Sequence, residues 1–452
     1  MNKDISKTKL FIAFISLIIT FFVWQQGLRD SLNRPSVSFD ISQKEKEIAE
    51  LALPAIPKNL RNLLIFNDPI EDIENSLSEI SFDKLTERNK LIWIISPKNN
   101  NINIKKDYLK SFDNENYKLV VENLSKSNLD NSYRPNDNLL DLFKEDRFLY
   151  HLLSKRYSFD ESQLITSSLS KRMFLKIIAI RLIPLLTIVF GSLLVLKTFW
   201  RVMASKKIEW KEFKPLDLDL LDMVLLISGG FVVLGEVISP LFSITLVQLV
   251  ASNLSIELTQ SLKIFFGYVF MAIPPLFIIY SQIKSFENKF VFKKDYFEFN
   301  FLPIKDSFFL GFKGFLMIIP FVLIVSLIMN LLVDNQNGSN PLLEIVLNSN
   351  NYVSFILLFL TTTFLAPIFE EVIFRGVLLP ILSREFGIVL GITTSAFIFA
   401  LAHLSISEMI PLFTLGIGLG TTRLISGRLS SSVIMHSLWN GMTFLNLFLL
   451  RT

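Results

Sequence analysis

Long apolar stretches alternate with charged segments along the chain, and the apolar stretches have the length of membrane helices. Crossing a bilayer takes roughly 20 predominantly apolar residues in a helix. We expect a transmembrane helix in each of nine stretches, near Leu10–Trp24, Ile177–Phe199, Leu220–Leu241, Leu262–Tyr280, Ser307–Val333, Tyr352–Leu382, Ile388–Leu404, Met409–Leu424 and Ser430–Leu450. The pattern therefore predicts an all-α polytopic membrane protein with about nine transmembrane helices.

A long charged segment, Arg29–Arg172, separates the first apolar stretch from the second. Within it, runs such as SQKEKEIAELAL place apolar residues at helical spacing, which predicts a mostly helical domain outside the membrane. His151 lies among charged neighbours there, and we expect a solvated surface histidine. The predicted organisation has four parts, an N-terminal membrane anchor, this polar domain, a first set of transmembrane helices and a membrane core, at residues 1–28, 29–172, 173–350 and 351–452.

Positive charge alternates between loops and predicts the orientation in the membrane. Cytoplasmic loops carry the excess of Lys and Arg. Loops rich in these residues, at Lys197–Lys214, Lys284–Lys294, Arg384 and Arg423–Arg428, alternate with loops that have none. The N-terminus is then cytoplasmic and the polar domain extracytoplasmic. WQQG after the first stretch lacks the small residues of a signal-peptidase site, which favours an uncleaved anchor.

The amino-acid composition agrees with a membrane protein and excludes any structure or catalysis that depends on cysteine. Hydrophobic residues make up 51% of the chain, and its mean hydropathy is +0.46. The formal net charge of +4 reflects basic membrane flanks, so we expect no nucleic-acid partner. The absence of cysteine excludes disulfides, thiolate catalysis and cysteine-ligated zinc. We expect an integral protein of the plasma (cell inner) membrane or a comparable internal membrane, in contact with the lipid bilayer.

Glu370, Glu371 and Arg375 are unusual because they lie within the apolar run LAPIFEEVIFRGVLLPIL. Each charge near a bilayer centre costs roughly 2.5–3.5 kcal/mol, which points to a function for the cluster. Glu371 and Arg375 are spaced i, i+4 and should form an ion pair. Glu370 points to another helix face, so we expect it to be a free carboxylate suited to a general base. Pro367 should bend the helix, and the threonines at 361–363 should satisfy the carbonyls it frees.

Two of the three histidines lie in the apolar segments that follow. Phe399 and His403 share a helix face, as do His436 and Asn440. The imidazole of His436 and the amide of Asn440 could together bind an oxyanion. We expect these groups and Glu370 to form one site. The alternative is structural, in which the ion pair and the histidines only link neighbouring helices.

These residues carry a family resemblance. EEVIFR at Glu370–Arg375, FALAH at Phe399–His403 and HSLWN at His436–Asn440 resemble the signature motifs of the CPBP family. This family comprises the CAAX-protease and bacteriocin-processing (Abi) membrane proteases, including type II CAAX prenyl endopeptidases. The resemblance covers roughly 351–450 and implies hydrolysis of a peptide bond in a membrane-associated peptide or protein.

By the same resemblance, Glu370 and His403 polarise the attacking water, and His436 and Asn440 stabilise the oxyanion. Glu371 and Arg375 orient the site, and Phe399 supports it.

The need for a metal and the nature of the activity stay open at this stage. Glu370, His403 and His436 are candidate ligands for a divalent metal such as zinc, but the chain lacks an HExxH motif. A water activated by glutamate without a metal is equally consistent with these residues. One alternative function is a non-proteolytic scaffold or immunity-type protein of the same family. Another is a proton-coupled transporter that uses the buried carboxylates.

Overall fold

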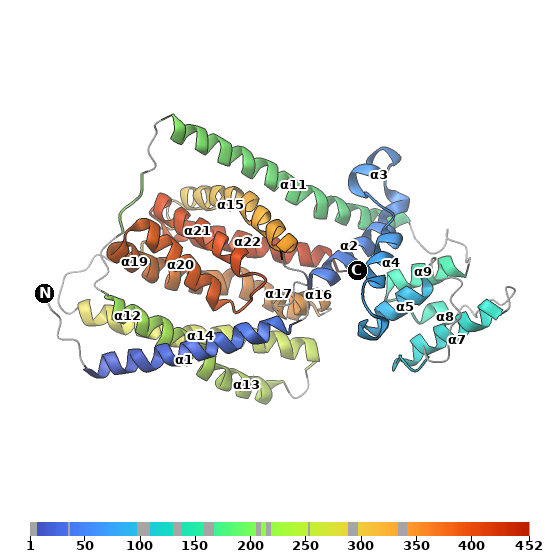
Figure 1. Cartoon of the computed structure of the whole chain (residues 1–452), viewed down its shortest axis with the longest axis horizontal. Coiled ribbons are helices and arrows are strands. Elements are labelled where there is room, and N and C mark those ends of the chain that lie inside the picture. Colours follow the sequence, from blue (N-terminus) through green and yellow to red (C-terminus); the bar gives the residue numbers. More distant parts are fainter. Residues whose placement is uncertain are drawn as a thin grey trace. The chain divides into compact units, whose positions relative to one another are not determined.

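The structure is a computed structural model that describes residues 7–34, 37–96, 109–129, 138–157, 167–204, 209–213, 218–251, 254–287, 297–332, 341–349 and 351–451. Within these ranges the regular secondary structure is helical and no strand occurs (Figure 1). The predicted all-α class is therefore confirmed.

The described chain forms two compact units. The first comprises Met1–Ser38 and Leu185–Phe448, and the second comprises Phe39–Pro184 and Leu449–Thr452. The expected polar domain at 29–172 lies mostly within the second unit. Its limits differ from that expectation because two long helices, α1 (Lys7–Leu32) and α11 (Ser167–Met203), continue beyond their apolar stretches.

The first unit contains the membrane helices. Besides α1 and part of α11, it holds α12 (Leu220–Val224), η4 (Leu225–Ile238), α13 (Ser239–Val250), α14 (Ile256–Glu287), α15 (Ile304–Leu332), α16 (Pro341–Asn348), α17 (Tyr352–Leu360), η5 (Thr361–Leu365), α18 (Ala366–Glu371), η6 (Val372–Leu378), α19 (Leu379–Phe386), α20 (Ile388–Ala402), α21 (Met409–Ser426) and α22 (Leu429–Leu449).

Seven helices in the described part of the chain are long and apolar enough to cross a membrane, so the expected count of nine is not confirmed. The two predicted helices outside this set are α20, which has only 15 residues, and α22. The protein is nevertheless an integral membrane protein. Several lysines that predict its orientation lie outside the described residues, namely Lys206, Lys207, Lys214, Lys289, Lys293 and Lys294.

Three segments of π-helix occur in this unit, and each ends two residues before a proline. They are η4 before Pro240, η5 before Pro367 and η6 before Pro380. Proline has no N–H to donate and its ring crowds the preceding turn, so a wider turn before it relieves the clash. Two of these segments flank Glu370 and Glu371, and the helix that carries the acidic pair is therefore irregular on both sides of it.

Close packing of α20 and α21 depends on a glycine. A Cβ added at Gly416 would lie 2.9 Å from the Cβ of Ala396, closer than carbon atoms approach. At Gly420 the nearest atom, on Ile392, would be 3.4 Å away, which is ordinary contact. Gly416 is thus the position that lets the two helices approach, and this contact places the FALAH segment beside α21.

The second unit is a small helical domain. It contains α2 (Val37–Ala52), α3 (Lys58–Leu64), α4 (Pro69–Ser78), α5 (Glu87–Ile95), α7 (Glu115–Leu129), α8 (Asn138–Asp141) and α9 (Arg147–Arg156). Arg88 joins three of its helices, with its guanidinium 2.6 Å from carboxylate oxygens of both Glu47 and Asp146. Burial disfavours the charge on Asp146, but Arg88 outweighs it and holds the pKa of that carboxyl below its ordinary value.

His151 was expected on the surface, and that expectation is wrong. The residue is only 7% exposed, and its Nε2 lies 3.2 Å from Oε1 of Glu50 on α2. Buried polar groups need partners, and Glu50 supplies one. The charged neighbours of His151 in sequence suggested solvent, but α9 turns this face toward α2.

Candidate active site

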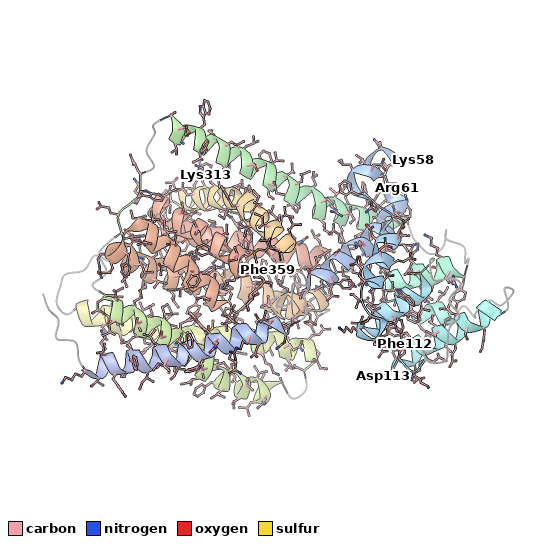
Figure 2. The ribbon with its side chains drawn as sticks, in the orientation of Figure 1. Lys58, Arg61, Phe112, Asp113, Lys313 and Phe359 are labelled. Carbon is pink, nitrogen blue, oxygen red and sulfur yellow. The ribbon has the colours of Figure 1, made fainter. Side chains whose placement is uncertain are left out.

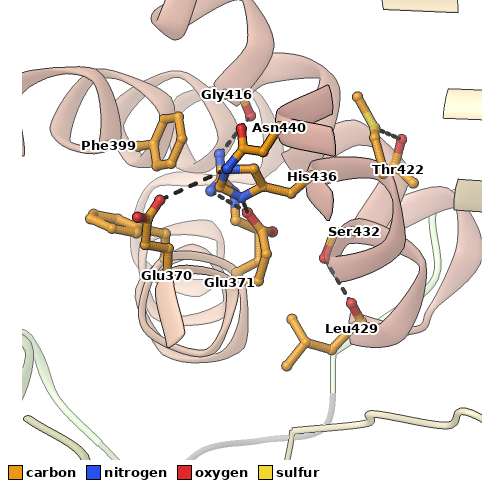
Figure 3. A network of polar contacts seen from close by, with 12 residues as sticks. Glu370, Glu371, Phe399, Gly416, Thr422, Leu429, Ser432, His436 and Asn440 are labelled. Carbon is orange, nitrogen blue, oxygen red and sulfur yellow. Dashed lines mark hydrogen bonds and ion pairs between the residues drawn. The ribbon is translucent and has the colours of Figure 1, made fainter. Parts of the chain in front are cut away.

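A buried ion pair and a histidine form the base of the candidate site (Figure 3). Nη1 of Arg375 donates to Oε1 of Glu371 at 2.8 Å, and Nδ1 of His436 lies 3.0 Å from the same oxygen. Nη2 of Arg375 also donates to the Gly416 carbonyl on α21 at 3.2 Å. Glu371 and Arg375 are fully buried. The ion pair expected from the i, i+4 spacing is therefore present, and it also fixes the ring of His436.

Glu370 faces both histidines. Its Oε2 lies 3.9 Å from Nε2 of His403 and 3.9 Å from Nε2 of His436. These separations are longer than hydrogen bonds. The same oxygen is buried and has no hydrogen-bond partner within the described structure. Glu370 thus differs from Glu371 as expected, because one carboxylate is paired and the other offers a free oxygen between two imidazoles.

Phe399 and its own carbonyl orient His403. Nδ1 of His403 lies 2.8 Å from the Phe399 carbonyl oxygen, which can only accept, so this nitrogen carries a hydrogen. The Phe399 ring packs edge-on against both histidines, with centroids 4.7 Å from His403 and 5.7 Å from His436. The guanidinium of Arg375 lies 4.3 Å from the centre of the same ring. One aromatic side chain therefore contacts both imidazoles and the ion pair.

Asn440 lines the same cavity as Glu370 and the two histidines, but one N–H of its side-chain amide is already hydrogen-bonded. Its Nδ2 donates to the Thr362 carbonyl at 2.9 Å. Within η5, the N–H of Ala366 bonds to the carbonyl of Thr361. The next residue along, Pro367, has no N–H for Thr362, and Asn440 supplies the missing donor. The second N–H of the Asn440 amide remains available for another acceptor.

The expectation for the threonines near Pro367 is wrong in detail. The Thr361 and Thr362 hydroxyls donate to Leu357 and Leu358, one turn earlier than the carbonyl that the proline frees. A donor from α22, far away in sequence, meets that carbonyl instead. The interruption of the helix at Pro367 and the position of Asn440 are consequently linked through the Thr362 carbonyl.

Two cavities of the first unit meet at Glu370 and His403. The smaller, of about 230 Å³, is also lined by His436, Asn440 and Trp439. The larger, of about 670 Å³, lies beside α1, η4 and α14 and includes Asp30 and Glu236. Tyr268 on α14 lines both cavities. No Lys or Arg occurs among the described residues that line the larger one.

Helix α1 contributes to the site in a way that the sequence did not indicate. Oγ of Ser31 accepts from the Ile406 N–H at 3.3 Å, and Arg34 donates to the Leu404 carbonyl, also at 3.3 Å. Leu404 follows His403 and has a φ of 48°, a conformation that L residues rarely adopt. The end of α1 thus holds the turn that carries His403. Trp24, two turns before Ser31 on α1, donates at 3.2 Å to Glu236, which lines the larger cavity.

The three candidate metal ligands, Glu370, His403 and His436, face one another at distances somewhat longer than those around a bound zinc ion. No group of three or more His, Asp or Glu side chains among the described residues has the required geometry. Tetrahedral zinc with bonds near 2 Å places its ligands roughly 3.4 Å apart. Glu370 is 3.9 Å from Nε2 of each histidine, and Nδ1 of each histidine bonds to another acceptor, Glu371 for His436 and the Phe399 carbonyl for His403. A metal held by these three residues stays a hypothesis.

The fold and the site together define a helical membrane protein with a buried carboxylate, two histidines and an amide at one point. Residues 352–442 match the family described as "Type II CAAX prenyl endopeptidase Rce1-like", and all seven candidate site residues lie within them. This match confirms the resemblance to the CAAX proteases. Residues 38–175 match "Domain of unknown function (DUF8675)". Searches of curated proteins and of solved structures found no match.

Proposed function

We propose that this protein is a membrane-embedded endopeptidase of the CAAX-protease type. The observation that carries the proposal is the approach of His403 and His436 to one unpartnered oxygen of Glu370, at 3.9 Å each. A site of this kind can hold one reacting water between a base and two imidazoles. The Rce1-like match over residues 352–442 supports the same reaction class.

In the proposed mechanism, Glu370 accepts a proton from a water that His403 orients through Nε2. The hydroxide attacks the peptide carbonyl carbon, and the C–N bond then breaks as Glu370 returns the proton to the leaving nitrogen. A doubly protonated His436 donates its Nδ1–H to Glu371 and its Nε2–H to the oxyanion. The free N–H of Asn440 is the second oxyanion donor. Each of these steps uses side chains alone.

We propose that the substrate is a membrane-associated peptide or protein that reaches Glu370 through the larger cavity. Its volume of about 670 Å³ is within the range of small-molecule and peptide-side-chain sites. The distribution of Lys and Arg among the loops supports a cytoplasmic N-terminus. We propose the plasma (cell inner) membrane or a comparable internal one as the location.

The test is peptide cleavage by the purified full chain in detergent. Candidate substrates come from comparing the membrane proteomes of cells that express the wild type and Glu370→Gln. We expect Glu370→Gln and His403→Ala each to lower kcat/KM by at least about 100-fold, because each removes a group that handles the water proton. Glu385→Gln is the matched control, since this carboxylate pairs with Arg384 away from the site and is half-exposed.

Cleavage that survives both Glu370→Gln and His403→Ala would overturn the proposal. Proton-coupled flux into proteoliposomes that Glu370→Gln abolishes would instead identify a transporter. A chelator strong enough to strip zinc should leave the rate unchanged, and a loss that added zinc restores would contradict a mechanism based on side chains alone.

A further inference from the structure

A third cavity of the membrane unit lies away from the candidate active site, between α11, α15 and α21. Its volume is about 420 Å³, and its lining is almost entirely apolar. Lys313 on α15 is the one charged side chain among its described lining residues (Figure 2). Helix α11 packs tightly on α15 at Gly191, where an added Cβ would lie 2.1 Å from the Leu316 carbonyl oxygen. The cavity opens two turns further along α11, at Thr198.

Two more cations lie on α11 within one turn of Thr198, which lines the cavity. Lys197 and Arg201 of α11 interact electrostatically with Lys313, and all three charges have the same sign. Lys197 and Arg201 are spaced i, i+4, so they share one face of α11. None of the three forms an ion pair with a described residue of the chain. Three like charges beside an apolar cavity repel one another, and an anion placed among them removes that repulsion.

We propose that this cavity binds an anionic phospholipid, with one acyl chain in the apolar space and the phosphate bound by Lys197, Arg201 and Lys313. The combination of an apolar cavity and a basic rim between membrane helices fits a lipid with a negative headgroup. The Lys- and Arg-rich loop after α11 places these residues on the predicted cytoplasmic side, where anionic lipids concentrate. The proposal uses no residue of the proposed peptidase site.

The lipid would contact the outer face of α21. Of the α21 residues that line the cavity, Thr414, Ile417 and Thr421 lie between about 100° and 160° around the helix from Gly416. Gly416 faces α20, because a Cβ added there would lie 2.9 Å from the Cβ of Ala396, and its carbonyl accepts from Arg375. A bound lipid therefore supports the helix from one side while the buried ion pair holds it from the other.

The experiment is lipid binding by the purified full chain in detergent, measured by native mass spectrometry. The probes are dioleoyl phosphatidylglycerol and dioleoyl phosphatidylcholine. We expect tighter binding of the phosphatidylglycerol, and a loss of about fivefold in its affinity for each of Lys197→Gln, Arg201→Gln and Lys313→Gln, since one Lys or Arg near a lipid surface contributes about that factor. Lys284→Gln is the matched control, because this exposed lysine lies on α14 and does not line the cavity.

A second variant tests the acyl-chain space independently of charge. Thr421→Phe should fill the cavity and weaken phosphatidylglycerol binding while the melting temperature stays near that of the wild type. Inorganic phosphate and dihexanoyl phosphatidylglycerol should compete poorly if the chain is bound. Equal affinity for the two dioleoyl lipids, equal effects of Lys284→Gln and Lys313→Gln, or full competition by inorganic phosphate would each overturn the proposal. Displacement of the phosphatidylglycerol by a prenylated peptide at equal concentration would also overturn it, by assigning the cavity to another ligand.

Discussion

At the scale of single residues, the site depends on keeping two adjacent carboxylates in different states. Glu371 receives Arg375 and His436, while Glu370 keeps an oxygen without a partner. Because neighbouring helix residues differ by 100° in direction, adjacent positions in sequence give two different surroundings. The protein thereby obtains one structural carboxylate and one available for chemistry from a single Glu-Glu dipeptide.

Arg375→Met should destabilise the protein strongly. The change leaves the Glu371 charge fully buried without its cation, and breaking such a pair costs about 3–5 kcal/mol. The measurement is thermal unfolding of the purified protein in detergent. Arg384→Met, which removes a half-exposed ion pair and a hydrogen bond to the Leu218 carbonyl, should cost less, about 1–2 kcal/mol.

The double variant Glu371→Leu with Arg375→Met should recover much of the lost stability, because it removes both charges. Equal melting temperatures for Arg375→Met and Arg384→Met would contradict the importance of the pair.

At the scale of elements, irregular helices position the site. The π-helical segments η5 and η6 both precede prolines, and they lie on either side of Glu370 and Glu371. Asn440 on α22 is drawn to the carbonyl that Pro367 leaves without a donor. The carbonyl that Pro367 leaves free in its own helix therefore fixes the position of α22 through Asn440.

This relation predicts energetic coupling between Pro367 and Asn440. Asn440→Ala should destabilise the wild type by about 1 kcal/mol, since it leaves the partly buried Thr362 carbonyl without its protein donor. In a Pro367→Ala background, residue 367 regains an N–H for Thr362, and the same change should cost clearly less. A double-mutant cycle of unfolding free energies measures the difference. Additive costs would show that the carbonyl does not link the two residues.

Helix α1 lies outside the matched Rce1-like segment yet holds the turn after His403. Ser31→Ala combined with Arg34→Gln should lower kcat about tenfold with a smaller change in KM, because small displacements of a catalytic group are costly. Arg29→Gln, an exposed change on the same helix, serves as the control. Cleavage kinetics on one peptide substrate give both constants. A change in KM alone would mean that α1 contributes to binding and not to the placement of His403.

At the scale of the whole molecule, the two units have different chemistry. The membrane unit buries charge in its candidate site, whereas the second unit holds the partly buried Arg88 between Glu47 and Asp146. This cluster joins α2, α5 and the start of α9, so it stabilises the small domain as a whole.

The low pKa of Asp146 predicts that acid weakens the second unit. A carboxyl with a lowered folded pKa contributes its full stability above its ordinary value of 3.8. It loses that contribution as the pH falls through the lower folded value. Hydrogen exchange of α5 and α9 in the full chain should therefore accelerate below about pH 4, and Asp146→Asn should reduce the pH dependence. Asp141→Asn, at an exposed carboxylate, should leave it unchanged.

Much of the fold and the membership of the site could be predicted from sequence, because both follow from local patterns. The length of the apolar stretches predicts membrane helices, and the i, i+4 spacing predicts the pair of Glu371 and Arg375. The three motifs also indicate Glu370, His403, His436 and Asn440 as one group. The count of nine transmembrane helices is not confirmed, because α20 and α22 lie outside the seven described helices that are long and apolar enough to span a membrane.

The sequence by itself therefore determined the class of protein and the residues of the candidate site. Only the tertiary structure decided how those residues are paired. His436 bonds to Glu371, Asn440 bonds to Thr362, and Ser31 and Arg34 hold the turn after His403. The burial of His151 against Glu50 is likewise a contact between residues that are distant in sequence. Periodicity and spacing act over one or two turns of helix, whereas these contacts join residues from 65 to 375 positions apart, and packing alone selects them.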